Sequence, residues 1–170
     1  MIRLRHQLSL FLPAAHALTP RIEAVRRVVD PVQHHLIAAH VTLCRDEDGL
    51  DLHAVAERLG RHPPAALRLG FGPAQVFQGH GLLLPCVRGG EAFAALRRQA
   101  LAETGVRAQQ PHLTLAHPRN PLAPGNRRAA TTALPQTFDI DLDQLHLIRQ
   151  QGDAPWTVLR TIRLSGAPRP

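Results

Sequence analysis

Two short stretches of the chain each carry a histidine and, two residues later, a threonine. Residues 40–43 read His-Val-Thr-Leu and residues 112–115 read His-Leu-Thr-Leu, and each stretch lies in an apolar run typical of a β-strand. Because successive side chains of a strand point to opposite faces, His40 and Thr42 share one face while the two apolar residues share the other. In the second copy, 72 residues later, His112 and Thr114 likewise share one face, and the two leucines share the other. We therefore expect two strands with apolar backs, whose polar fronts face each other across one cleft.

A pair of imidazoles in one cleft suits phosphodiester chemistry. Histidine has an ordinary pKa of about 6.5, so near neutral pH one ring can be neutral while its partner is protonated. The neutral ring takes a proton from an attacking hydroxyl or water, and the protonated ring gives one to the leaving alkoxide. His40 and His112 are the candidate acid–base pair, and the symmetry of the motif leaves open which is which. Thr42 and Thr114 can donate hydrogen bonds to the phosphate oxygens. This scheme needs neither a metal nor a cofactor.

The alternative interpretation of these histidines is structural. A single such histidine is most simply a buried, hydrogen-bonded side chain. The repeated hydroxyl on the same inferred face favours a functional site instead.

Composition narrows the kinds of chemistry further. The chain has 170 residues and a formal net charge of +7, and its 20 basic residues are all arginine. The absence of lysine excludes a P-loop lysine, a Schiff-base lysine and a lysine nucleophile that takes up AMP. The arginine surplus suits phosphate or nucleic-acid partners, or reflects a compositional bias. No apolar run is long enough to span a membrane, and Cys44 and Cys86 are the only cysteines, so we expect a cytoplasmic protein without structural disulfides.

Hydrophobic periodicity and turn residues predict alternating strands and helices, with strands dominating. The predicted strands cover residues 2–12, 34–43, 66–71, 75–78, 81–87, 106–116, 138–149 (with a bulge near 143) and 156–164. The predicted helices cover residues 19–29, 51–59 and 91–104, with one or two helical turns in 127–134 after a Pro-rich loop at 118–125. This order favours an α+β fold with mainly antiparallel pairing, and the recurring motif indicates two copies of a half-domain.

The motifs and their surroundings resemble those of the two-histidine (2H) phosphoesterase superfamily, which includes bacterial 2′-5′ RNA ligases and RNA 2′,3′-cyclic phosphodiesterases. Residues 39–43 (Ala-His-Val-Thr-Leu) are similar to its first motif and residues 111–116 (Pro-His-Leu-Thr-Leu-Ala) to its second. Residues 145–164, with Gly-Asp-Ala-Pro-Trp at 152–156, are similar to its closing hairpin. The resemblance covers most of the chain.

This resemblance implies one bilobed α+β domain over residues 1–170, in which two pseudo-symmetric lobes of mainly antiparallel sheet and flanking helices surround a central cleft. It implies opening of 2′,3′-cyclic phosphates on RNA ends or nucleotides, and the reverse, ATP-independent 2′-5′ ligation. The expected partners are RNA ends or nucleotides with a cyclic phosphate, for a monomer that binds no membrane. Two other functions remain: a non-catalytic module that binds nucleotides or RNA ends in the same cleft, and a general RNA-binding protein driven by arginine charge.

Further candidates surround the motifs. The family often carries Arg or Lys two residues after the second motif, where this chain has His117 followed by Arg119, and Arg45 follows the first motif. These three are candidate substrate-binding residues, and the loop arginines at 127 and 128 either reach a phosphate or are solvated. Cys44 should share the face of His40, as a nucleophile or, more simply, as a packed thiol. The histidines at 34, 35 and 117 lack partners at ligand spacing, so we expect no metal site.

Overall fold

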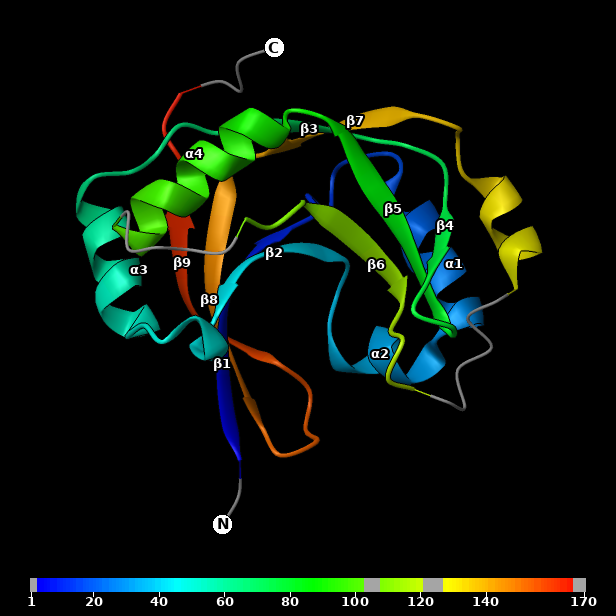
Figure 1. The fold of residues 1–170 in the computed structure, drawn as a ribbon, viewed down its shortest axis with the longest axis horizontal. Coiled ribbons are helices and arrows are strands. Elements are labelled where there is room, and N and C mark those ends of the chain that lie inside the picture. Colours follow the sequence, from blue (N-terminus) through cyan, green and yellow to red (C-terminus); the bar gives the residue numbers. More distant parts are fainter. Residues whose placement is uncertain (1–2, 103–107, 121–126, 167–170) are drawn as a thin grey trace.

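The computed structural model describes residues 3–102, 108–120 and 127–166. Two antiparallel sheets lie side by side, with helices around them (Figure 1). The α+β, two-sheet architecture predicted for the chain is confirmed.

The first sheet has the strand order β2-β1-β8-β9, so each end of the chain contributes two neighbouring strands. Its strands are β1 (Leu4–Phe11), β2 (His40–Arg45), β8 (Gln144–Gln151) and β9 (Thr157–Arg163). Helix α3 (Leu52–Arg61) packs against β1, β8 and β9. The Asp51 side chain begins this helix by accepting hydrogen bonds from the backbone N–H groups of His53 and Ala54, at 2.9 and 3.2 Å.

The second sheet has the order β4-β5-β3-β7, and β6 pairs with β5 as well. Its strands are β3 (Leu67–Phe71), β4 (Gln75–Phe77), β5 (Gly81–Arg88), β6 (His112–Ala116) and β7 (Phe138–Leu142). The strand of the first motif, β2, lies at the edge of its sheet and contacts β6, the strand of the second motif. The predicted meeting of the two motif strands is therefore observed.

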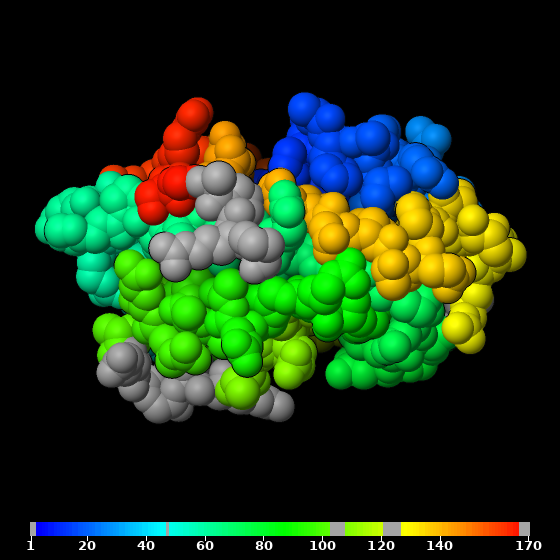
Figure 2. All heavy atoms as spheres, turned by 90° about the horizontal axis from the view of Figure 1, so that it is seen from above, coloured from blue at the N-terminus to red at the C-terminus, as the bar shows by residue number. Residues whose placement is uncertain are grey.

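The helices that join the motif strands to their partners reach across the molecule. Helix α1 (Thr19–Val29) connects β1 to β2 but packs against β6 and the 3-10 helix η2 (Arg128–Ala133). Helix α4 (Gly90–Leu101) connects β5 to β6 and packs against α3 and β3. From above, α3 lies at one end of the molecule (teal) and η2 at the other (yellow) (Figure 2). Buried side chains from both sheets form one continuous hydrophobic core.

Three sequence predictions are wrong in detail. Residues 34–43 do not form one strand, because α2 (Pro31–Leu36) precedes β2; the Asp30 side chain caps this helix by accepting from the Gln33 N–H, and Pro31 is its first residue. Residues 138–149 do not form one bulged strand, because the chain leaves the second sheet after β7 and enters the first at β8. The strand predicted at 106–116 begins later than predicted, at His112, and residues 108–111 are not part of it. Residues 106–107 of that strand, 103–104 of the helix predicted at 91–104 and 121–125 of the predicted Pro-rich loop lie outside the described residues. No described helix is long and apolar enough to cross a membrane.

Candidate functional site

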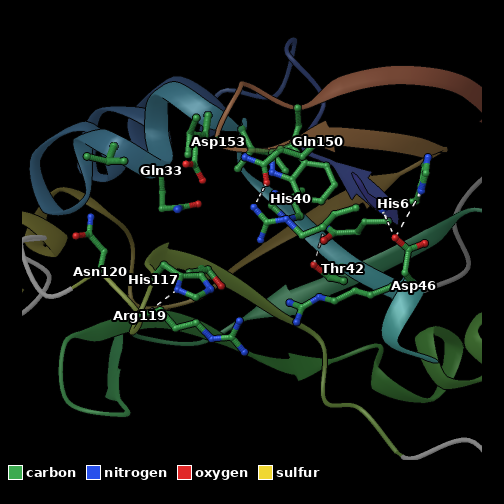
Figure 3. Close-up of a pocket in the computed structure, with 18 of the residues that line it drawn as sticks. His6, Gln33, His40, Thr42, Asp46, His117, Arg119, Asn120, Gln150 and Asp153 are labelled. Carbon is green, nitrogen blue, oxygen red and sulfur yellow. Dashed lines mark hydrogen bonds and ion pairs between the residues drawn. The ribbon is translucent and has the colours of Figure 1, made fainter. Parts of the chain in front are cut away.

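A cavity of about 500 Å³ opens between the motif strands (Figure 3). It brings together six of the seven predicted site residues: His40, Thr42, Arg45, Thr114, His117 and Arg119. His112 stands on β6, two residues before Thr114, and is not among the lining residues. Of the groups that lower the pKa of His40, His112 has the smallest effect.

The two motifs occupy equivalent positions in their sheets. His40 lies opposite Phe11 on β1, and Thr42 lies opposite Ser9. On the other side His112 lies opposite Pro85 of β5, and Thr114 opposite Leu83. The sequence repeat is therefore a structural repeat. In each copy the histidine precedes the threonine by two residues, on a strand that pairs with a neighbouring strand of its sheet.

A register shift follows the threonine in both copies. Thr42 pairs with Ser9 but Cys44 pairs with Leu8, so Leu43 is an extra residue in β2. Leu115 is the equivalent extra residue of β6, between the pairs made by Thr114 and Ala116. Such bulges bend a strand and redirect its side chains. The period-two argument therefore holds from the histidine to the threonine and fails beyond it.

The two imidazoles are held by the same type of hydrogen bond. Nδ1 of His40 lies 2.8 Å from the carbonyl oxygen of Ala38, and Nδ1 of His112 lies 3.0 Å from that of Gln110. A carbonyl oxygen can only accept, so Nδ1 carries the proton in each neutral ring. The lone pair of each neutral ring is therefore on Nε2.

Helix α1 fixes the segment that orients His40. The buried Arg26 guanidinium donates to the Ile37 carbonyl at 2.8 Å and to the Glu23 carboxylate at 2.8 Å. Glu23 in turn accepts from the backbone N–H of Ala39. The residues on both sides of Ala38 are thus anchored, which positions the carbonyl that binds the His40 ring.

Burial lowers the pKa of His40 from 6.5 to about 4, with smaller contributions from the positive charges of Arg26, Arg45 and His112. The hydrogen bond to Ala38 acts in the opposite direction and does not offset the burial. The ring is therefore neutral at physiological pH. A neutral ring with a free Nε2 is a proton acceptor.

The Thr42 hydroxyl is oriented by a buried glutamine. Nε2 of Gln7 donates to Thr42 Oγ1 at 3.1 Å and to Ser9 Oγ at 2.6 Å. Because the Thr42 oxygen already accepts a hydrogen bond, its own proton can be donated to a ligand. The sequence analysis missed Gln7. Its signal was the polar alternation of Arg5, Gln7 and Ser9 along β1, of which Arg5 and Gln7 line the cavity.

Side chains from the second half of the chain bind the carbonyls of edge strand β2. Gln109 Nε2 donates to the Thr42 carbonyl at 3.0 Å, and the buried Arg97 of α4 donates to the carbonyl of Leu43, the bulge residue. Arg97 also reaches Asp48 at 3.3 Å. An unpaired edge would leave these acceptors unsatisfied, so Arg97 and Gln109 stabilise the bulge and with it the position of Thr42.

The residues that follow the two bulges are also equivalent. The backbone N–H of Arg45 donates to Asp48 Oδ2 at 2.9 Å, and that of His117 donates to Asp30 Oδ2 at 2.9 Å. Both side chains line the cavity. Nδ1 of His117 accepts from the backbone N–H of Arg119 at 3.1 Å, as the dashed line in Figure 3 marks, so the neutral ring carries its proton on Nε2. Burial and the nearby Arg119 and Arg45 lower the pKa of His117.

The electrostatic character of the cavity is positive. Two aspartates line it, Asp46 and Asp153, together with five arginines: Arg3, Arg5, Arg26, Arg45 and Arg119. Guanidinium groups bind phosphate oxygens, so this balance favours an anionic ligand.

Other sequence candidates do not reach the site. Cys44 is fully buried in the core and burial raises the pKa of its thiol to about 12, so it is not a nucleophile. The bulge explains why it leaves the face of His40. His34 lies 3.6 Å from the Glu23 carboxylate. Within the described parts of the chain, no group of three or more His, Cys, Asp or Glu residues is arranged to hold a metal ion.

A family model for the 2′-5′ RNA ligase superfamily matches residues 13–154. The chain belongs to this superfamily. The family match spans both motif strands, so it supports the resemblance seen in the motifs themselves. The curated proteins include no significant match to the chain.

Solved structures with the same fold include two complexes of E. coli LigT. The complex with phosphate has 17% sequence identity and a TM-score of 0.56, and the match covers 98% of this chain and 100% of that chain. The complex with 3′-AMP has 17% identity and a TM-score of 0.50, with the same coverage. A structure described as a phosphoesterase has 16% identity and a TM-score of 0.52, covering 96% of this chain and 100% of that one. At these identities the likeness establishes the fold.

Proposed function

We propose that the protein opens 2′,3′-cyclic phosphates of RNA ends or nucleotides, with His40 and His112 as the acid–base pair. The observation that carries the proposal is the matched hydrogen bonding of the two rings. Each is fixed through Nδ1 to the carbonyl two residues earlier, which leaves Nε2 for the substrate. LigT, which shares the fold, has been crystallised with phosphate and with 3′-AMP, and a nucleotide-binding cleft is consistent with this proposal.

We assign His40 the role of base in hydrolysis, which its lowered pKa supports because the ring is then neutral. His40 Nε2 takes a proton from water as the water oxygen bonds to phosphorus. His112, protonated on Nε2, donates a proton to the ribose oxygen as its bond to phosphorus breaks. Thr42 and Thr114 donate to the phosphate oxygens on which negative charge builds up. The product is a ribose with one free hydroxyl and one phosphate monoester.

The proposed 2′-5′ ligation uses the same groups. When the 5′-hydroxyl of a second RNA strand replaces water, the same displacement forms a new phosphodiester. The energy of the strained cyclic diester drives this step, so it needs no ATP and no lysine to accept AMP. In this proposal, hydrolysis and ligation both require the two histidines and no metal ion.

The test is hydrolysis of a 2′,3′-cyclic nucleotide in the presence of EDTA. We expect turnover to persist with the chelator and to fall about 100-fold or more in His40→Ala and in His112→Ala. His80→Ala, at an exposed turn, is the matched control and should keep full activity. Turnover that is lost with EDTA contradicts the proposal, and so does turnover that survives when His40→Ala and His112→Ala are combined. Tight binding of 3′-AMP with no turnover of any cyclic phosphate points instead to a binding module.

A further inference from the structure

The cavity extends beyond the histidine pair toward the hairpin between β8 and β9. Trp156, in the turn of that hairpin, lines the cavity next to the end of helix α2. The apolar part of this extension is formed by Val32, Leu36 and Ile37. The acid–base chemistry uses none of these residues, so the extension needs another explanation.

Trp156 is held firmly at this end of the cavity. Its backbone N–H donates to the carbonyl of Leu36 at 2.9 Å, which ties the hairpin to α2. The guanidinium carbon of Arg5 lies 5.7 Å from the centre of the indole ring, a cation–π arrangement. Arg5 itself donates to the side chain of the buried Gln150 on β8. The indole is therefore a preformed, half-buried aromatic surface with a positive charge over one of its faces, which leaves the other face for a base.

The spacing along β1 places this surface about one nucleoside away from the phosphate-binding threonine. Thr42 contacts Gln7, and Arg5 is the next residue on the same face of β1, about 7 Å further along a strand. Trp156 lies next to Arg5. A nucleotide whose phosphate lies at Thr42 would thus extend its base toward Trp156.

We infer that Trp156 and α2 form a nucleobase subsite, in which the base of the nucleotide that carries the phosphate stacks on the indole ring. This inference rests on the proposed function for the position of the phosphate. Aromatic side chains are the usual stacking surface for unpaired bases, and the chain offers few aromatic residues elsewhere.

Two polar side chains give this subsite a preference among bases. Gln33 and Asp153 line the cavity and lie on the same side of His40 in the view of Figure 3. The Asp153 carboxylate can accept a hydrogen bond from an exocyclic amino group, and the Gln33 amide can both donate and accept. The subsite therefore favours bases that carry an amino group, adenine, guanine and cytosine, over uracil.

Trp156 provides a direct readout, because the chain contains one tryptophan and no tyrosine. Its fluorescence is measured while nucleoside 3′-monophosphates, which have no cyclic ester to open, are added to the intact protein. We expect quenching by 3′-AMP and 3′-GMP, weaker quenching by 3′-UMP, and none by ribose 5-phosphate or inorganic phosphate. Equal quenching by ribose 5-phosphate, or calorimetric binding of 3′-AMP without any change in fluorescence, overturns the inference.

A second experiment measures the preference for a base in turnover. The quantity is the ratio of KM for ribose 2′,3′-cyclic phosphate to KM for guanosine 2′,3′-cyclic phosphate. Loss of one base-stacking contact corresponds to about 5- to 150-fold in affinity, so Trp156→Leu should lower this ratio by that factor. Leu159→Ala, an exposed position on β9 outside the cavity, is the control and should leave it unchanged. An unchanged ratio in Trp156→Leu overturns the inference.

The two experiments separate this inference from the proposed function. If no cyclic phosphate is turned over but 3′-AMP quenches Trp156, the acid–base proposal is wrong and the base subsite stands. If guanosine 2′,3′-cyclic phosphate is turned over with the same ratio in Trp156→Leu, the acid–base proposal stands and the base subsite is wrong. Asp153→Asn refines the result, because it should reduce the advantage of 3′-GMP over 3′-UMP.

Discussion

The depressed pKa of His40 makes a sharp prediction for the pH dependence of turnover. The acid limb of kcat/KM reports the base of the free enzyme. Since burial lowers the pKa of His40 to about 4, this limb should lie near pH 4 and not near the ordinary histidine value. The protonated partner keeps its proton as the pH falls, so it does not cause a loss on this side.

The size of the effect follows from the two pKa values. An ordinary imidazole with a pKa of about 6.5 is roughly 10% neutral at pH 5.5, against about 75% at pH 7. A base with a pKa of about 4 remains almost completely neutral at both pH values. Between pH 7 and about pH 5.5, protonation of the base should therefore lower kcat/KM by less than about 1.5-fold, where an unshifted base would cause a loss of nearly tenfold.

The assay is hydrolysis of guanosine 2′,3′-cyclic phosphate, whose base does not titrate between about pH 4 and pH 8, with circular dichroism to confirm folding at each pH. Arg45→Met tests one of the smaller electrostatic contributions, because removing this positive charge should move the acid limb to higher pH. A loss of nearly tenfold between pH 7 and 5.5 in the folded wild-type protein would refute the assignment of His40 as the buried base.

Four further predictions concern stability and the supports of the site. His40 is neutral when folded and has an ordinary pKa when unfolded, so the stability it contributes is complete above about pH 6.5 and is lost as the pH falls toward about 4, by up to about 3 kcal/mol; urea unfolding of His40→Asn should show a correspondingly weaker acid dependence. Thr42→Val should lower kcat about 100-fold in steady-state kinetics, because it removes a hydroxyl donor that Gln7 orients. An unchanged kcat would mean that this hydroxyl does not bind the phosphate. Arg97→Met should reduce the free energy of unfolding by about 1–3 kcal/mol, since the Leu43 carbonyl loses its partner, and an unchanged urea midpoint would contradict this. Cys44 should not react with a thiol reagent until the protein is unfolded, which mass spectrometry of the labelled peptides can establish.

Period-two alternation was enough to predict which side chains share a face within each motif. His40 and Thr42 line one cavity because nothing interrupts the strand between them. The same alternation placed Cys44 on that face, and the extra residue Leu43 makes this wrong. A bulge leaves no mark in an apolar run, because Val, Leu and Cys are equally compatible with a regular strand and with an interrupted one.

A missed helix start and long-range pairing were the other sources of error. The helix predicted at 19–29 does end at Val29, but Asp30 followed by Pro31 also begins α2, so residues 34–36 are helical and not part of a strand. The segment 138–149 alternates as one strand would, but its two parts pair with different sheets, since β7 meets β3 and β8 meets β1. The roles of Gln7 and Trp156 depend on partners far away in the chain, which no local pattern reveals.

The crossing of the chain between its two sheets has a consequence for how the protein can be divided. The first sheet combines β1 and β2 with β8 and β9 from the other end of the chain, and α1 leaves it to cover β6. A fragment ending between the two motifs would lack half of its own sheet and would leave α1 with no surface to cover. We expect each half to be insoluble when expressed alone and the two to recover activity only when produced together.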